Sequence, residues 1–149
     1  YGLEFDVPEV EDYLVPIGKA KVRREGSDVT ITAHSRMVGF ALQAAEKLAE
    51  EGIECEVVDL RTLRPLDHET IVESVKKTNR LVCVEEGWGP MGVGAEVAAR
   101  IQELAFYHLE APILRATGYD TPYPPAKLEE FWLPSVDRIL DLVEHSLTY

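Results

Sequence analysis

The amino-acid sequence predicts an α/β fold, a three-layer α/β/α sandwich in which helices cover both faces of a mainly parallel sheet of about five strands. Short β-branched or apolar runs alternate with segments of helical periodicity from residue 28 onward, an order typical of parallel strands joined by crossover helices. Residues 81–84 are almost wholly apolar, as expected of a strand that is covered on both faces. Glycines and capping residues separate these segments.

The first strand and helix of this alternation follow a turn at residues 26–28. Residues 29–33 (VTITA) are rich in β-branched side chains and predict a strand. Residues 37–51 carry apolar side chains at helical spacing. We expect Ser35 to cap this helix and Gly52 to end it, because serine favours the N-cap and glycine the left-handed exit.

The same scheme repeats along the rest of the chain. Further strands are expected at residues 19–22 (a short edge strand), 54–59, 81–84 and 113–116, and further helices at residues 67–78, 95–105 and 135–146. Asp67 and Ser135 are the expected N-caps of two of these helices, and Asn79 the left-handed exit of the first. Residues 1–16 hold two prolines and five acidic residues and predict an extended linker or arm, leaving one domain over residues 17–149.

Composition excludes several classes of protein. The net charge of −12, from 15 basic and 27 acidic residues, argues against nucleic acid as a partner, because phosphates require a basic surface. No apolar run approaches the roughly 18 residues of a membrane-spanning helix. The acidity suits a basic protein partner, but solubility explains it equally well. Cys55 and Cys83 lie inside apolar runs, which favours buried core residues in a reducing compartment over a disulfide or zinc site.

Catalytic and metal-binding patterns are weak. The four histidines form neither an i, i+4 pair nor an HExxH motif, so a metal site has little support. Glu85 and Glu86 could perform acid–base chemistry, but a solvated strand end, or one carboxylate accepting an N–H from the following turn, explains them more simply. No nucleophile–base set is legible, which ranks an independent enzyme lowest.

A small-ligand site is a second hypothesis. Gly92 and Gly94 begin like a dinucleotide fingerprint, but Val97 stands at the third glycine and Glu96 would repel a pyrophosphate, so a tight strand-to-helix turn is favoured. His34, Ser35 and Arg36 follow a parallel strand at the edge where α/β sheets bind ligands. These three residues suit either capture of a phosphate or carboxylate, or hydrogen bonding between domains, and we favour the second interpretation.

Aromatic side chains gather in the proline-rich segment before the last helix. Loop aromatics of this kind, here Tyr119, Tyr123, Phe131 and Trp132, belong either to an interface or to the packing of the last helix, and the two interpretations are compatible.

Four stretches carry a family resemblance. Residues 54–67 (ECEVVDLRTLRPLD) closely resemble the carboxyl-terminal domain of transketolase-like enzymes, and in particular that of pyruvate dehydrogenase beta subunits. Residues 16–21 (PIGKAK), the VEEGW and GVGAE runs between residues 84 and 96, and the AP and TG pairs between residues 111 and 118 agree with it. The resemblance covers essentially the whole chain.

The resemblance implies a division of labour between domains. The intact beta subunit resembles a two-domain protein in which a pyrimidine-binding domain precedes this one. Thiamine diphosphate and magnesium lie between that domain and the alpha subunit, and the catalytic glutamate and histidine also belong to the preceding domain. No catalytic, cofactor-binding or metal-binding residue is therefore carried over to this chain. It is expected to be a noncatalytic assembly and docking domain, with residues 1–16 leading from the preceding domain. The parent enzyme would decarboxylate pyruvate and reductively acetylate lipoyl groups.

Partners and compartment also follow from the resemblance. It implies an α2β2 tetramer that docks onto the small basic subunit-binding domain of the dihydrolipoyl acyltransferase core. Glu110 and Tyr149 match positions implicated in that docking. The His34–Arg36 and 85–96 stretches resemble the pyruvate type, whereas residues 118–122 also occur in branched-chain relatives, so a branched-chain beta subunit is the alternative. The compartment would be a bacterial cytoplasm or a mitochondrial matrix.

Overall fold

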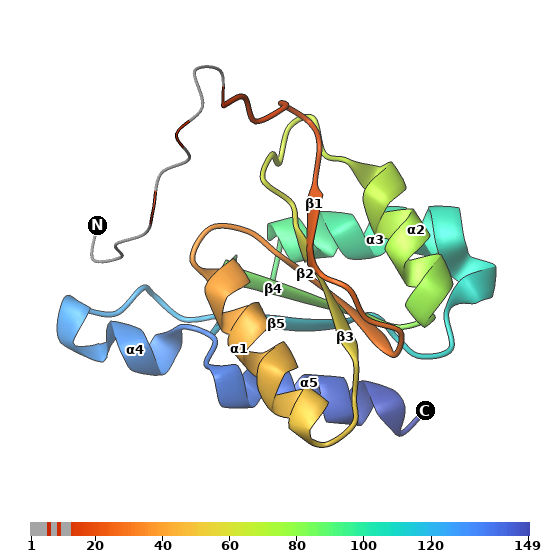
Figure 1. Cartoon of the computed structure of the whole chain (residues 1–149). Helices are drawn as coiled ribbons and strands as arrows, with labels where there is room; N and C mark the ends of the chain where they lie inside the picture. Colours follow the sequence, from red (N-terminus) through yellow and green to blue (C-terminus); the bar gives the residue numbers. More distant parts are fainter. Residues whose placement is uncertain (1–5, 7–8, 10–12) are drawn as a thin grey trace.

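The computed structural model describes residues 6, 9 and 13–149. Within these residues one five-stranded sheet has the order β1-β3-β2-β4-β5, in which β2 to β5 are parallel and β1 is antiparallel to β3 (Figure 1). The strands are β1 (Lys21–Arg24), β2 (Val29–Ala33), β3 (Cys55–Asp59), β4 (Leu81–Trp88) and β5 (Leu114–Gly118). The predicted α/β class and the mainly parallel sheet are confirmed.

Helices cover both faces of the sheet and complete the three layers (Figure 1). The helices are α1 (Met37–Glu50), α2 (His68–Thr78), α3 (Val93–Ala105), α4 (Glu129–Trp132) and α5 (Val136–Leu147), with short 3-10 turns η1 (Phe106–His108) and η2 (Ala126–Leu128). Helices α1 and α5 pack on one face, and α2 and α3 on the other. Each face has its own apolar core, which is why β2 and β4 are buried on both sides.

Local chemistry sets most helix ends as predicted. Asp67 caps α2 by accepting the amide of Thr70, and Ser135 caps α5 by accepting the amide of Arg138. Asn79 leaves α2 in the left-handed conformation, at φ 62°. The prediction for α1 was wrong at its start. Ser35 itself has φ 55°, and Arg36 becomes the N-cap with no side-chain cap bond.

Strand and helix boundaries differ from the predictions around β4. Strand β4 continues to Trp88, four residues beyond the predicted end, and pairs there with Gly118 of β5 after a register shift. Helix α3 begins at Val93, earlier than the predicted residue 95. Within the extension, the buried Glu85 carboxylate accepts the amide of Gly94. One of the two simpler interpretations of the Glu85–Glu86 pair is thereby confirmed.

Polar groups inside the fold are mostly paired. Thr30 on β2 hydrogen-bonds both Ser74 and Thr78 of α2 at 2.7 Å. Glu56, 1% exposed, pairs with Lys77, and hydrogen bonds to Glu25 and then to Glu56 raise the pKa of that lysine. Both cysteines are buried and free, as predicted.

The expected arm over residues 1–16 lies largely outside the described residues. Residues 13–16, which the structure describes, belong to no helix or strand. Among the described helices, none is both long enough and apolar enough to cross a membrane.

Candidate functional site

The carboxyl ends of the parallel strands define one edge of the sheet, here called the carboxyl edge. The first crossover leads from β2 outward to β3, and the next returns past β2 to β4. The connections therefore reverse direction between β2 and β4, and this switch point is where open α/β sheets bind ligands. His34, Ser35 and Arg36 follow β2 here, and Glu85 and Glu86 belong to β4.

Arg36 is already engaged within the domain. Its Nε lies 3.3 Å from Oε1 of Glu86, and its guanidinium lies 5.6 Å from the ring centroid of Phe40. The Ser35 side chain does not cap α1, whose N-cap is Arg36. Of the side chains proposed to capture an anion, Arg36 is thus already paired with a carboxylate, and Ser35 does not cap the helix.

Glu85 explains the two glycines at the start of α3. A Cβ on Gly92 would lie 2.5 Å from Oε1 of Glu85, and a Cβ on Gly94 would lie 2.9 Å from the same atom. Only glycine permits such an approach of the turn to the carboxylate. The space that a dinucleotide fingerprint reserves for a pyrophosphate holds the Glu85 side chain here.

The cavity remaining at the switch point is small, about 10 Å³. Its lining includes Thr32, His34, Cys83 and Glu85. A phosphate or nucleotide needs far more space than this and would meet a buried carboxylate. The anion or nucleotide hypothesis is therefore not favoured.

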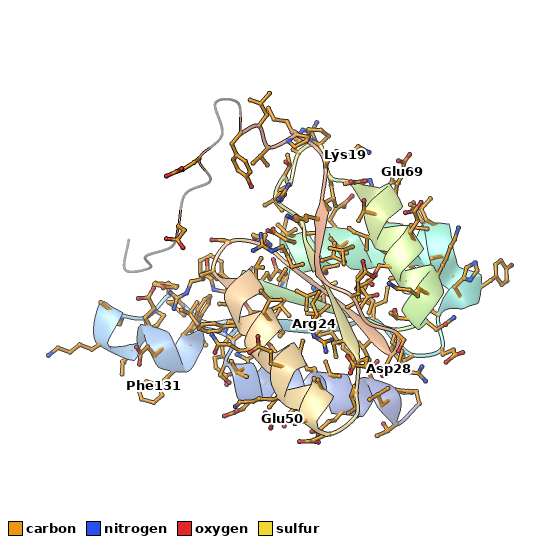
Figure 2. All side chains as sticks on the ribbon, in the orientation of Figure 1. Lys19, Arg24, Asp28, Glu50, Glu69 and Phe131 are labelled. Carbon is orange, nitrogen blue, oxygen red and sulfur yellow. The ribbon has the colours of Figure 1, made fainter. Side chains whose placement is uncertain are left out.

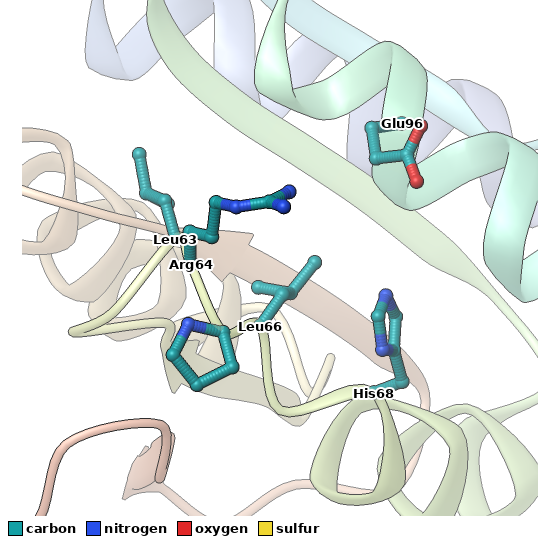
Figure 3. Close-up of a pocket in the computed structure, with 6 residues that line it drawn as sticks. Leu63, Arg64, Leu66, His68 and Glu96 are labelled. Atoms are coloured by element: carbon teal, nitrogen blue, oxygen red, sulfur yellow. The ribbon is translucent and has the colours of Figure 1, made fainter.

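A larger pocket lies beside it, between α3 and the loop that precedes α2. Its volume is about 800 Å³, and Figure 3 shows Arg64, His68 and Glu96 facing the same space, which Leu63 and Leu66 also line. Nε2 of His68 is buried and has no hydrogen-bond partner among the described residues. The sequence analysis did not single out this group. Arg64 belongs to the RPLD run of the family resemblance, but Glu96, which faces it, comes from a different element. The sequence alone therefore does not predict that they meet.

Glu110 lies at the opposite edge of the sheet, where the strands begin. Arg80, just before β4, donates through Nη1 to Oε2 of Glu110 (2.9 Å) and through Nε to the carbonyl of Ser146 (3.2 Å). Ser146 belongs to the last turn of α5. Tyr149 follows this turn, and its ring packs edge-on against His145 with centroids 5.2 Å apart. The structure therefore brings Glu110 and the end of α5 to one region, which we call the amino edge.

The aromatic segment serves the fold and leaves part of itself exposed. Trp132 is buried and packs edge-on against Trp88 and Tyr123, with centroids 5.7 and 4.9 Å away. Phe131, in contrast, is 78% exposed and points away from the domain (Figure 2), and Tyr119 is half exposed. Packing of the segment is thus confirmed for Trp132, and the interface interpretation stays a prediction for the exposed rings.

Comparison with known proteins identifies the family. The sequence profile described as "Transketolase, C-terminal domain" matches residues 18–139. The chain belongs to the transketolase C-terminal domain family. This family assignment agrees with the resemblance found in the sequence.

Similar curated proteins and solved structures agree with the family. The chain is 54% identical over 152 residues to the mitochondrial pyruvate dehydrogenase E1 component subunit beta of Bos taurus, covering 99% of this chain and 42% of that protein. It is 53% identical to the subunit of that name from the bacterium Leifsonia xyli, covering 100% and 44%. A split-gene transketolase, solved as an inactive beta4 tetramer, superposes with a TM-score of 0.81 at 34% identity, covering 95% and 46%. The chain thus spans under half the length of the curated relatives it matches.

Within this transketolase C-terminal domain, local signals found some site residues and not others. The family resemblance points to Glu110 and Tyr149, but not to Arg80, which lies between them and whose partners are 30 and 66 residues away. His34 and Glu85 were both singled out, but their meeting across the switch point could not be anticipated from spacing.

Proposed function

We propose that this chain is the carboxyl-terminal domain of the beta subunit of a thiamine-diphosphate-dependent pyruvate dehydrogenase, and that it assembles and docks the enzyme without performing chemistry itself. The observation that carries the proposal is 54% identity to a pyruvate dehydrogenase E1 beta subunit over 99% of the chain. The parent enzyme would decarboxylate pyruvate and reductively acetylate lipoyl groups. Its compartment would be a mitochondrial matrix or a bacterial cytoplasm, since the relatives come from both settings.

The carboxyl edge is assigned to contact with the pyrimidine-binding domain that precedes this one. The chain enters the domain at this edge, where the Gly18 amide donates to Oγ1 of Thr62 and the Ala20 amide donates to Oδ2 of Asp67, each at 3.0 Å. Leu14 and Ile17, on the entering segment, are each more than 80% exposed. Apolar side chains exposed to this extent suit coverage by a neighbouring domain. His34, Ser35 and Arg36 lie along the same edge and would hydrogen-bond across that boundary.

Thiamine diphosphate and magnesium do not fit the residues of this chain. The switch-point crevice is closed by the Glu85 carboxylate, which would repel a diphosphate. In the part of the chain that the structure describes, no three His, Cys, Asp or Glu side chains gather as a metal site would require. Both groups are therefore assigned to the parent enzyme, at a boundary that this domain helps to hold.

The amino edge is assigned to docking on the acyltransferase core. Glu110 remains 57% exposed despite its bond to Arg80, and Tyr149 is 61% exposed. Covering the carboxyl edge with a second domain would leave this opposite edge accessible. The net charge of −12 favours a small basic partner such as the core's subunit-binding domain, through faster and more selective encounter.

The test is a calorimetric titration of the full-length α2β2 assembly with the purified subunit-binding domain, repeated across salt concentrations. We expect saturable binding that weakens as salt rises. A variant lacking Tyr149 should bind more weakly while retaining decarboxylation activity. Absence of binding by a folded assembly would contradict docking and leave this domain a role in tetramer packing alone.

A further inference from the structure

The small cavity between α3 and the carboxyl ends of β2 and β4 is lined mostly by apolar side chains, with polar groups among them. Three of them are Thr32, near the end of β2, His34, which follows β2, and Glu85 on β4. Thr32 is 1% exposed and Glu85 is 3% exposed, so both polar groups have left bulk water. Groups buried in this way need hydrogen-bond partners.

Thr32 lacks a partner where its neighbour on the strand has two. Thr30 and Thr32 face the same side of β2, toward α2 and α3. The Thr30 hydroxyl is satisfied by Ser74 and Thr78, both at 2.7 Å. Oγ1 of Thr32 is buried and no nitrogen or oxygen of the described residues hydrogen-bonds to it, and the Cys83 thiol beside it on β4 is only a weak partner. An orphaned hydroxyl costs about 1–3 kcal/mol, so its retention beside a cavity that Glu85 and His34 also line points to a ligand.

Glu85 also has capacity to spare. Its Oε1 accepts the amide of Gly94 at 3.0 Å, and this bond uses one of several acceptor positions on a carboxylate. Arg36, on the same edge, pairs with Glu86 rather than with Glu85. The His34 ring, half-buried at the rim, adds a nitrogen that can donate or accept.

We infer that Thr32, His34 and Glu85 bind one buried water molecule. The volume of about 10 Å³ is close to what a single water requires, and a buried water makes two to four hydrogen bonds. The water accepts from the Thr32 hydroxyl, donates to the Glu85 carboxylate and bonds the His34 ring. The crevice that binds ligands in related α/β architectures is thereby reduced to a site for a single molecule.

This water adds a side-chain link between β2 and β4, which already pair through their backbones. It ties the end of β2 to β4 and, through Glu85 and Gly94, to the first turn of α3. The water also orients His34. The His34 ring, at the edge assigned to the preceding domain, is then held by a water anchored in the core.

The test compares Thr32→Val with Thr32→Ser in the full-length protein with the subunits it assembles with. Valine keeps the shape and removes the hydroxyl, whereas serine keeps the hydroxyl. We expect the melting temperature of Thr32→Val to fall by about 3–6 °C more than that of Thr32→Ser. A crystal structure at about 1.5 Å should show one water peak within hydrogen-bond distance of Oγ1 in the parent and none in Thr32→Val.

Two outcomes would overturn the inference. If the site is dry, removing an unsatisfied hydroxyl should leave stability unchanged or raise it, and the parent should show no peak. A peak with five or more oxygen neighbours, replaceable by rubidium with an anomalous signal, would identify a monovalent cation instead of water.

Discussion

Arg80 donates from Nη1 to the Glu110 carboxylate at 2.9 Å and from Nε to the carbonyl of Ser146. One guanidinium thus fixes an acidic side chain against the last turn of the last helix. The Arg80 side chain is only 18% exposed, whereas that of Glu110 is 57% exposed. The cation is therefore held by the fold and presents the carboxylate outward.

Glu110→Lys should weaken binding of the acyltransferase subunit-binding domain by about 10- to 100-fold, because it replaces an attractive charge with a repulsive one at the assigned docking edge. An exposed ion pair contributes at most about 1 kcal/mol, so the fold should survive. Calorimetry on the full-length assembly measures the affinity. Glu130→Lys, the same change on α4, is the control and should bind normally. Equal affinities for Glu110→Lys and the parent would remove Glu110 from the docking surface.

Gly118→Ala should destabilise the protein by about 1–3 kcal/mol, because the new Cβ would lie 2.2 Å from Cη2 of Trp132 and the indole would have to move. Chemical denaturation followed by tryptophan fluorescence measures both the stability and the indole environment. Gly39→Ala is the matched control. Its Cβ would meet nothing within 4 Å on α1, and it should stabilise by up to about 1 kcal/mol. A Gly118→Ala protein as stable as the parent would show that the Trp132 packing can relax.

Sequence reasoning succeeded where the controlling chemistry is local. The ends of α2 follow from Asp67 and Asn79, whose own side chain or backbone conformation determines the cap. It failed at Ser35 because the backbone adopts a left-handed conformation there, so the N-cap passes to Arg36 regardless of serine's preference.

The candidate site was predictable only in its parts. His34 and Glu85 directly follow the strands expected at residues 29–33 and 81–84, so the sequence predicts both at strand ends. The end of β4 differs from the prediction because it depends on the pairing of Trp88 with Gly118 of β5, far along the chain. The partner of Glu85, the amide of Gly94, is likewise nine residues away. The facing of Arg64 and His68 to Glu96 likewise depends on how α3 lies over the loop before α2.

Lys77→Met should destabilise the protein by about 1–3 kcal/mol, because Glu56 is buried and would be left without its cationic partner. Lys76→Met, the neighbouring exposed lysine on α2, removes the same charge and is the control; it should change stability little. Urea denaturation measures both. Equal stabilities for the two variants would mean that Glu56 finds another partner or takes up a proton.

The two thiols should be unreactive in the folded protein. Burial raises the pKa of Cys55 and of Cys83 to about 12, and only the thiolate is nucleophilic. With Ellman's reagent at pH 8, both should react slower than an unhindered thiol by roughly three orders of magnitude. Both should react at once in guanidinium. A fast reaction of either thiol in native buffer would contradict its burial.

Asp67→Asn should cost stability at neutral pH and progressively less in acid. Burial alone would raise the pKa of Asp67, but hydrogen bonds from Thr70 and Ala20 and the charge of Lys19 outweigh it and hold the pKa below its usual value. A depressed pKa in the folded state stabilises the fold at pH values above the unfolded pKa, near 4, and this contribution is lost as pH falls through the folded pKa. We therefore expect a deficit of about 1–2 kcal/mol at pH 7, since an amide cannot accept at both positions, shrinking below about pH 4. Ser135→Ala removes the cap of α5 without a titrating group, so its deficit should stay constant over that range. A deficit for Asp67→Asn that did not change with pH would show that the carboxylate acts only by its shape.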